Sequence, residues 1–322
     1  MNTGRRYPSK ILLIGEYSLL QGYEALGLPF RRFVASLVMP DETKKRISIP
    51  GPVNRVLEKY YNKWLCRYKE LKDALDLDRF GADIRKGLHI ESDIPARKGI
   101  GSSGALCAAI YGNYARNPVS TVDSQDQESW RSLRSVFILM ESWFHGRSSG
   151  FDPLLSYLDR PLWLQGSGKI VGADFQGLIP GEMKVFLADA GPKEETPVLI
   201  RRTIKEFRQG FGGPRPGEEL GELNNRCISF LMNGNGPAFA GAVKDLSGFQ
   251  LANMRWLIPG KLREIWARGL AEDSFYLKLC GSGGGGFMLG FSRDAGRTEG
   301  VFSSAGISTI NVEWNGRDVV GE

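Results

Sequence analysis

The chain has 322 residues, and its 41 glycines are about 13% of them, against a usual share of about 7%. The glycines follow no three-residue period, which excludes collagen, and a hydrophobic content of 42% with a charged content of 24% excludes general disorder. The net charge of +6 is spread along the chain, which argues against nucleic-acid binding and suits an enzyme that handles anionic phosphates.

The four cysteines show neither a CxxC pair nor the spacing of a disulfide framework, so we expect reduced thiols in a cytoplasmic protein. The two histidines are too few for a multi-histidine zinc site. No apolar stretch has the length of a membrane span, and the short apolar run after Arg5 and Arg6 ends at Glu16. A soluble protein without a membrane partner is expected.

The first 180 residues alternate between strand-like runs and helical periods. They predict strands at 10–14 and 33–39, an amphipathic helix at 56–75, a strand at 87–94, helices at 102–115 and 130–144, and a hairpin at 161–171.

The second part, after a predicted domain junction at 177–182, mixes helices with strands that could pair antiparallel. It predicts strands at 183–190, 275–279, 287–291 and 307–313, and helices at 196–207, 219–232 and 259–269, with a shorter helical segment between the last two. The glycines from Gly210 to Gly221 indicate a flexible connection without an assigned role. The whole pattern favours the α+β class.

The segment Pro95–Ala105 reads PARKGIGSSGA and leads directly into a predicted helix. Its small residues allow close approach of a ligand to the backbone, and the helix N-terminus forms an anion site. Two serine hydroxyls could bind phosphate oxygens or a metal. A glycine-rich turn with serine caps explains the same residues equally well.

The segment Leu279–Gly286 contains four consecutive glycines between two strands. Such a run weakens a fold through chain entropy, and a simple turn needs only one or two glycines. The run therefore favours a loop that must make room for a substrate or for the phosphate loop, over a mere hairpin.

Two further segments are ambiguous when taken alone. Glu141 and His145 share a helix face, and Asp152 follows after two glycines, which suits a magnesium ligand and a general base. Helix capping would explain the same residues. Lys10 begins an apolar strand that ends at Glu16, and both side chains could reach one pocket or simply face solvent.

Together, the order and content of these segments resemble the GHMP kinases, the superfamily of galactokinase, homoserine kinase, mevalonate kinase and phosphomevalonate kinase. The opening from Lys10 to Glu16 is similar to the superfamily's first motif, Pro95–Ala105 to its ATP-phosphate motif, and Leu279–Gly286 to its C-terminal glycine motif. The block from His145 to Asp152, preceded by Glu141, resembles mevalonate kinases most closely.

This resemblance implies a two-domain α+β fold. A domain like ribosomal protein S5 would cover residues 1–180, and a ferredoxin-like domain would cover 181–322. It also implies an ATP- and Mg²⁺-dependent kinase that phosphorylates the 5-hydroxyl of mevalonate in the cytoplasm, with no nucleic-acid or membrane partner. A homodimer is compatible with it.

The resemblance further implies roles for individual residues. Asp152 would be the catalytic carboxylate, Lys10 would pair with it, and Ser103 and Glu141 would hold Mg²⁺. The expected ATP-binding residues are Pro95, Gly99, Gly101, Ser102, Ser103 and Gly104. The expected acceptor-site residues are Glu16, Tyr17, His145, Ser149, Thr196, Gly281, Ser282 and Gly283.

Three positions depart from the mevalonate kinase pattern. Tyr17 stands where histidine is usual, Gly104 where alanine is common, and Pro153 where asparagine is frequent. Because Tyr17 belongs to the acceptor site, phosphomevalonate or a sugar stays open as the acceptor. A non-catalytic nucleotide-binding relative stays open as well, and so does diphosphomevalonate decarboxylase, although the block before Asp152 does not suit the decarboxylase pattern.

Overall fold

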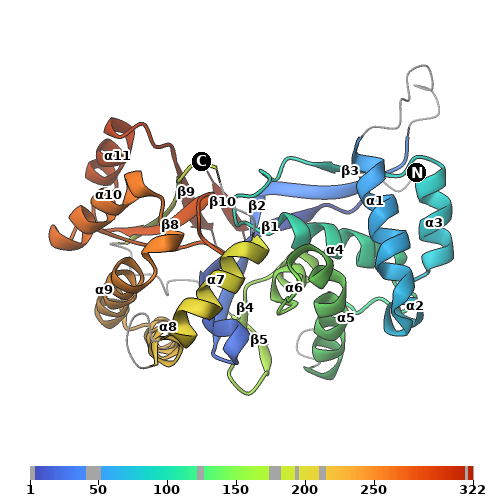
Figure 1. The fold of residues 1–322 in the computed structure, drawn as a ribbon, viewed down its shortest axis with the longest axis horizontal. Helices are drawn as coiled ribbons and strands as arrows, with labels where there is room; N and C mark the ends of the chain where they lie inside the picture. The colour runs from blue at the N-terminus through green and yellow to red at the C-terminus, as the bar shows by residue number, and fades with distance from the viewer. Residues whose placement is uncertain are drawn as a thin grey trace. The chain divides into compact units, whose positions relative to one another are not determined.

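The computed structural model describes residues 4–40, 52–121, 127–173, 183–192, 196–209, 215–315 and 318–321 (Figure 1). The chain divides into two compact units, each assembled from separate stretches of sequence. Unit 1 comprises Met1–Lys10, Arg31–Pro95 and Gly101–Asp159, and unit 2 comprises Ile11–Phe30, Ala96–Ile100 and Arg160–Glu322. The predicted domain boundary after residue 180 lies outside the described residues and stays a prediction.

Strands β1 (Tyr7–Ile14) and β2 (Ala25–Val38) contribute residues to both units. They belong to a sheet of order β1-β2-β4-β5, in which β3 also pairs with β2. Every residue of β1 is buried, as the apolar run of its sequence predicts. The predicted hairpin is confirmed, because β4 (Leu162–Leu164) and β5 (Ile170–Gly172) pair antiparallel.

Unit 1 is mainly helical, and α4 is its central helix. The residues of α4 from Gly104 to Tyr111 are all buried, and α4 packs against both α5 and α6. The elements of this unit are α1 (Pro52–Lys63), η3 (Leu65–Arg67), α2 (Lys69–Ala74), α3 (Leu77–Arg85), β3 (His89–Ser92), α4 (Ser102–Tyr114), α5 (Gln127–His145) and α6 (Phe151–Leu158).

The prediction of one continuous helix over 56–75 is wrong, because the chain breaks at Trp64 and again at Tyr68. Trp64 leaves the helical conformation, and its indole Nε1 donates a hydrogen bond of 2.7 Å to the Leu139 carbonyl of α5. Its ring also lies 5.7 Å from that of Trp143. These contacts with α5 outweigh the weak local preference for continuing the helix.

Unit 2 contains an antiparallel sheet of order β10-β9-β6-β8-β7. Along the chain, β6 is followed by helices, by the hairpin β7–β8, by α11 and by β9. This β-α-β-β-α-β order is the ferredoxin-like topology that the sequence predicts. The elements are β6 (Lys184–Asp189), β7 (Phe275–Leu279), β8 (Phe287–Ser292), α11 (Ala295–Ser304), β9 (Thr309–Asn315) and β10 (Asp318–Gly321).

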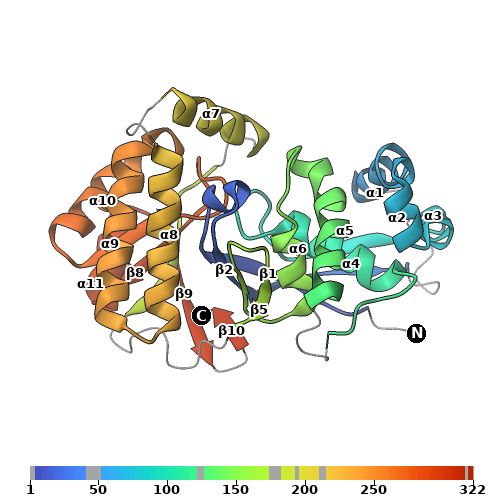
Figure 2. The same ribbon diagram turned by 90° about the horizontal axis from the view of Figure 1, so that it is seen from below.

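The remaining helices of unit 2 lie between β6 and β7 in sequence, and α8 and α9 pack side by side (Figure 2). The expectation of a short helical segment between the helices at 219–232 and 259–269 is wrong, because α9 has 18 residues. These elements are α7 (Thr196–Arg208), α8 (Pro216–Met232), α9 (Gly236–Asn253), η4 (Arg255–Leu257) and α10 (Gly260–Ala271); η1 (Ser18–Gln21) also belongs to this unit. Within the described ranges, every helix is too short or too polar to cross a lipid bilayer.

Part of the connection predicted as flexible at 210–221 is helical. Residues 210–214 lie outside the described residues, while Gly217 and Gly221 belong to α8. A Cβ atom at Gly217 would lie 2.6 Å from the side-chain oxygen of Gln21, and one at Gly221 would lie 2.4 Å from the ring of Tyr23. These two glycines therefore allow α8 to pack closely on η1 and the residues after it.

The glycine at position 104 allows an equally close contact between α4 and α6. A Cβ atom there would lie 2.9 Å from the carbonyl carbon of Asp152 and from the nitrogen of Pro153. We expect Gly104→Ala to lower the free energy of unfolding by about 1–3 kcal/mol, because the helices must shift apart. The measurement is urea unfolding followed by circular dichroism.

The matched control is Gly241→Ala in α9, where no atom lies within 4 Å of the added Cβ. We expect this change to stabilise the protein by up to about 1 kcal/mol, because alanine favours the helix over glycine. Equal effects of the two substitutions would contradict the close contact between α4 and α6.

Candidate active site

Five polar side chains of unit 1 meet near the first turn of α4, and we call them the lysine–carboxylate cluster. Lys10 Nζ lies 2.9 Å from Asp152 Oδ2. The hydroxyl groups of Ser103 and Ser148 donate hydrogen bonds to the two oxygens of Glu141, at 3.0 and 2.5 Å. The fold thus brings together four predicted site residues and adds Ser148, from four separate segments of the sequence.

The stem of Lys10 passes directly against Gly101 in the segment Pro95–Ala105, which we call the phosphate loop after its expected role. Lys10 is only 2% exposed, and a Cβ atom on Gly101 would lie 2.6 Å from its Cγ. Gly101 also has a φ of +82°, a backbone conformation that favours glycine. Steric clearance and backbone conformation therefore both require a glycine beside the lysine.

Negative charge exceeds positive charge in this cluster, since two carboxylates share one lysine. Burial, with the nearby Asp152 carboxylate as a second cause, raises the pKa of Glu141 to about 7. Hydrogen bonds from Ser148 and Ser103 and the charge of Lys10 oppose this shift in pKa. A second carboxylate therefore lies beside the pair of Lys10 and Asp152, and two serine hydroxyls stabilise it.

The turn between α5 and α6 places Ser148 and Asp152 in the cluster. Gly150 has a φ of +69°, and a Cβ atom there would lie 2.6 Å from the carbonyl oxygen of Arg134. The hydroxyl oxygen of Ser149 accepts the N–H of Phe151 at the start of α6. The Ser149 hydroxyl is therefore bonded within the turn before α6, and the adjacent Ser148 makes the contact with Glu141.

His145 and Thr196 are the last residue of α5 and the first residue of α7. Their side chains lie outside the described part of the structure, so their expected roles at the acceptor stay predictions.

In unit 2, the C-terminal glycine loop packs against the residues of the phosphate loop that belong to this unit. The N–H of Phe287 donates to the carbonyl of Lys98 at 2.9 Å. Cβ atoms at Gly281 and Gly286 would lie 3.2 and 2.9 Å from the backbone oxygens of Gly99 and Arg97. The prediction that this glycine run makes room for the phosphate loop is confirmed.

Backbone conformation is a second reason why these positions require glycine. Gly281 has a φ of +64°, and the four residues from Gly283 to Gly286 all have φ values between +63° and +120°. Residues with a Cβ rarely adopt this region. Four consecutive glycines are therefore a requirement of the loop's shape.

Glu16 and Lys278 form a completely buried ion pair in unit 2. Lys278 Nζ lies 2.6 Å from Glu16 Oε2 and also donates to the carbonyls of Leu12 and Leu279, at 3.3 and 2.7 Å. The other oxygen of Glu16 accepts the N–H of Gly281 at 3.4 Å. The structure thus places the expected acceptor-site residue Glu16 in a balanced pair beneath the glycine loop.

Tyr17 connects the glycine loop to α7. Its hydroxyl donates to the carbonyl of Ser282 at 2.7 Å and is also hydrogen-bonded to Thr203. Trp256 Nε1 donates to the hydroxyl oxygen of Thr203 at 3.2 Å. Burial raises the pKa of Tyr17 well above its usual value, so the phenol stays neutral. The residue that replaces the usual histidine therefore has partners within the protein.

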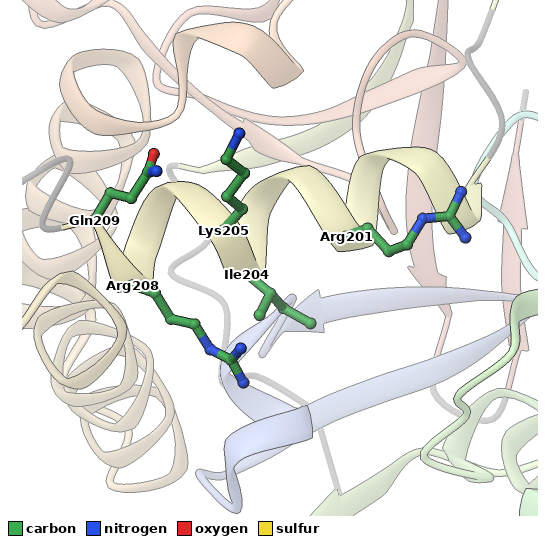
Figure 3. Close-up of a pocket in the computed structure, with 5 residues that line it drawn as sticks. All are labelled: Arg201, Ile204, Lys205, Arg208 and Gln209. Carbon is green, nitrogen blue, oxygen red and sulfur yellow. The ribbon is translucent and has the colours of Figure 1, made fainter.

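A pocket of about 430 Å³ lies along the exposed side of α7. It is lined by Arg201, Ile204, Lys205, Arg208 and Gln209 (Figure 3). The cationic side chains do not converge, because Lys205 extends to one side of the helix and Arg208 to the other (Figure 3). A ligand site needs convergent polar groups, so we assign no function to this pocket.

We expect Glu141→Gln to change the pH dependence of stability. The pKa of Glu141 is about 7 in the folded protein and 4.5 without perturbation, so the folded state binds the extra proton between these values. Wild-type stability should therefore fall relative to the variant as the pH rises from 5 to 8, by on the order of 2 kcal/mol. Urea unfolding in EDTA at several pH values measures this difference, and a difference independent of pH would contradict it.

Comparison with known proteins identifies the fold. No family model matches the chain. A mevalonate kinase from Pyrococcus abyssi is 24% identical over 302 residues, which are 87% of this chain and 86% of that protein. The structure of L. major mevalonate kinase in complex with R-mevalonate is 17% identical with a TM-score of 0.58, and the match covers 95% of this chain and 91% of that one.

A third match is the Streptococcus pneumoniae phosphomevalonate kinase in complex with phosphomevalonate and AMPPNP. It is 14% identical with a TM-score of 0.63, and the match covers 96% of this chain and 99% of that one. At such low identities, structural likeness establishes the shared α+β fold without distinguishing the acceptors. The sequence relatives at 24% identity or above are all named mevalonate kinase. The chain has the fold of the GHMP kinases, and mevalonate kinases are its relatives in sequence.

Proposed function

We propose that this protein transfers the γ-phosphoryl group of ATP to the 5-hydroxyl of mevalonate. The observation that carries the proposal is the ion pair between the buried Lys10 and the half-buried Asp152 at the start of α4, beside Glu141 and Ser103. Phosphoryl transfer depends on positioning and charge neutralisation more than on covalent chemistry. A helix N-terminus, one lysine and two carboxylates provide such a set.

Asp152 is the proposed proton acceptor. Lys10 Nζ, at 2.9 Å, holds one carboxylate oxygen of Asp152 in place and stabilises its negative charge. The carboxylate then orients the acceptor hydroxyl and receives its proton as the bond to phosphorus forms. The same ammonium group offsets negative charge that develops on the transferred group.

The first turn of α4 is the proposed phosphate site. The N–H groups of a helix's first turn have no partner within the helix, and the helix dipole favours an anion there. Ser102 and Ser103 stand at this turn, and Gly101 and Gly104 remove side chains that would obstruct a phosphate or the adjacent helix. Pro95 and Gly99 belong to the same loop.

The donor set beside α4 fits Mg²⁺. Glu141 and Ser103 offer oxygen ligands, which Mg²⁺ prefers, and Mg²⁺ usually binds one or two carboxylates together with substrate phosphates. Burial first, and the Asp152 carboxylate second, raise the pKa of Glu141, and a divalent cation beside it would favour its charged form. Glu141 and Ser103 would hold the ion, which when bound supplies neutralisation of the phosphate charge.

The proposed acceptor site includes Glu16, Tyr17 and Ser282 of unit 2. Tyr17 and Ser282 bond to each other and Glu16 pairs with Lys278, so these residues would shape the acceptor site rather than each offer it a free polar group. Gly281 and Gly283, like His145, Ser149 and Thr196, stay predicted contributors. The change from histidine to Tyr17 keeps another acceptor of the superfamily, such as phosphomevalonate, as the second candidate.

We also propose a cytoplasmic location, with mevalonate and ATP as the substrates. All four cysteines are free thiols in the structure, as the sequence predicts, and this suits a reducing compartment.

An acceptor screen tests the proposed reaction. Purified protein with ATP and Mg²⁺ is offered mevalonate, phosphomevalonate or galactose in separate assays, and ADP release is measured. We expect turnover with mevalonate and at most a small fraction of that rate with the others. Turnover with phosphomevalonate alone would replace the proposed acceptor, and release of CO₂ from diphosphomevalonate would indicate the decarboxylase.

The variant Asp152→Asn tests the catalytic carboxylate. We expect kcat to fall by a factor on the order of 10² or more, because the amide cannot accept the proton. The matched control is Asp159→Asn, which removes a carboxylate that pairs with Arg31 in the same unit, outside the cluster. Its kcat should stay near that of the wild type, and an unchanged kcat in Asp152→Asn would exclude this carboxylate from the mechanism.

A further inference from the structure

A second charged pair lies directly at the phosphate loop, within unit 2. Lys98, the residue before Gly99, places its Nζ 2.5 Å from Asp189 Oδ1. The two side chains are 22% and 29% exposed, so the pair is partly shielded from water. Neither residue belongs to the lysine–carboxylate cluster or to the sites that the sequence predicts.

Asp189 lies where β6 meets the C-terminal glycine loop. Its Oδ1 also accepts the N–H of Gly191 at 2.9 Å. The carbonyl of Gly191 in turn accepts the N–H of Gly286, and the N–H of Ala190 donates to the carbonyl of Gly286, at 2.9 and 2.7 Å. One carboxylate therefore joins the phosphate loop to the segment that holds the end of the glycine loop.

Lys98 is held by its backbone as well as by its side chain. Its carbonyl accepts the N–H of Phe287, and its Nζ lies 5.5 Å from the centre of the Phe287 ring. Arg97, the preceding residue, has a φ of +59°, which is a strained conformation for a residue with a side chain. Such a conformation persists only where its neighbours fix the backbone, and the contacts of Lys98 provide that restraint.

We propose that Lys98 and Asp189 act as a latch that holds the phosphate loop against the C-terminal glycine loop, and that they are positioning residues for ATP. The inference rests on the proposed function, because it takes these loops to be the nucleotide site. Since the chain runs from Lys98 through Ile100 directly into Gly101 and Ser102, loss of the latch would loosen the residues that lead into α4.

The competing role for Lys98 is a direct contact with the phosphates of ATP, with Asp189 only holding the side chain when no nucleotide is present. The two roles predict opposite behaviour for Asp189. If the pair is a latch, removing either partner breaks it and weakens ATP binding. If Lys98 binds phosphate directly, removing the charge of Asp189 leaves Lys98 available to ATP and does not weaken binding.

The experiment is a double-mutant cycle read by ATP affinity. Lys98→Met, Asp189→Asn and the double variant are titrated with a fluorescent ATP analogue, with no acceptor present. A charge-swapped variant, Lys98→Asp with Asp189→Lys, is measured alongside. The matched control is Lys244→Met, which breaks an exposed lysine–aspartate pair with Asp273 on other elements of the same unit.

We expect each single variant to weaken ATP binding by about three- to tenfold, as befits a partly buried ion pair, and the double variant to bind no more weakly than either. The swapped variant should recover part of the loss. Lys244→Met should bind ATP like the wild type, and KM for the acceptor should change less than KM for ATP in all latch variants.

Three outcomes would overturn the latch alone. Unchanged or tighter binding in Asp189→Asn together with weaker binding in Lys98→Met would show a phosphate ligand instead. Additive losses in the double variant would show that the two residues act independently. Wild-type affinity in all variants would show that the pair has no role in ATP binding. Failure of the wild type itself to bind ATP would overturn the proposed function along with the latch.

Discussion

The interaction on which the site of unit 1 depends is the ion pair between the buried Lys10 and Asp152, with the Glu141 carboxylate beside it. Burying an unpaired carboxylate is costly, and proteins avoid the cost by pairing, hydrogen bonding or protonation. Lys10 pairs with Asp152, while Glu141 has two serine hydroxyls and a pKa raised to about 7. The cluster joins α4, α5 and α6, because each of these helices supplies one member of it.

Close approach of backbone segments is the second constraint, and it explains much of the glycine excess. Gly101 lies against the stem of Lys10, Gly104 against the start of α6, and Gly286 against the phosphate loop. In each case a Cβ atom would lie within 3 Å of another residue. Gly217 and Gly221 serve close packing of α8 in the same way, at a distance from the motifs. Glycine therefore occurs here where two segments come into close contact, in addition to its expected role in binding anions.

Much of the fold could be predicted from local patterns, as the strand at Lys10 and the helix after Gly101 show. Apart from Ser148, the residues of the cluster are expected from the resemblance to GHMP kinases, because the pattern around Asp152 alone fits helix capping equally well. The break at Trp64 could not be predicted, because it depends on a contact with α5 that no local pattern contains. Lys98 and Asp189 could not be predicted for the same reason: 91 residues separate them, and each alone looks like an ordinary solvated charge.

The ion pairs of Lys278 and Lys10 differ in the number of carboxylates beside the lysine. This difference distinguishes a structural ion pair from a candidate functional one. Glu16 and Lys278 balance each other one to one, and the lysine has three acceptors for its three protons. Such a pair is satisfied within the protein, and it fixes β7 beneath the glycine loop. The cluster around Lys10 has one carboxylate in excess, which is the condition that a bound cation relieves. This difference supports the proposed Mg²⁺ site at Glu141 and Ser103, and it gives Glu16 a structural role.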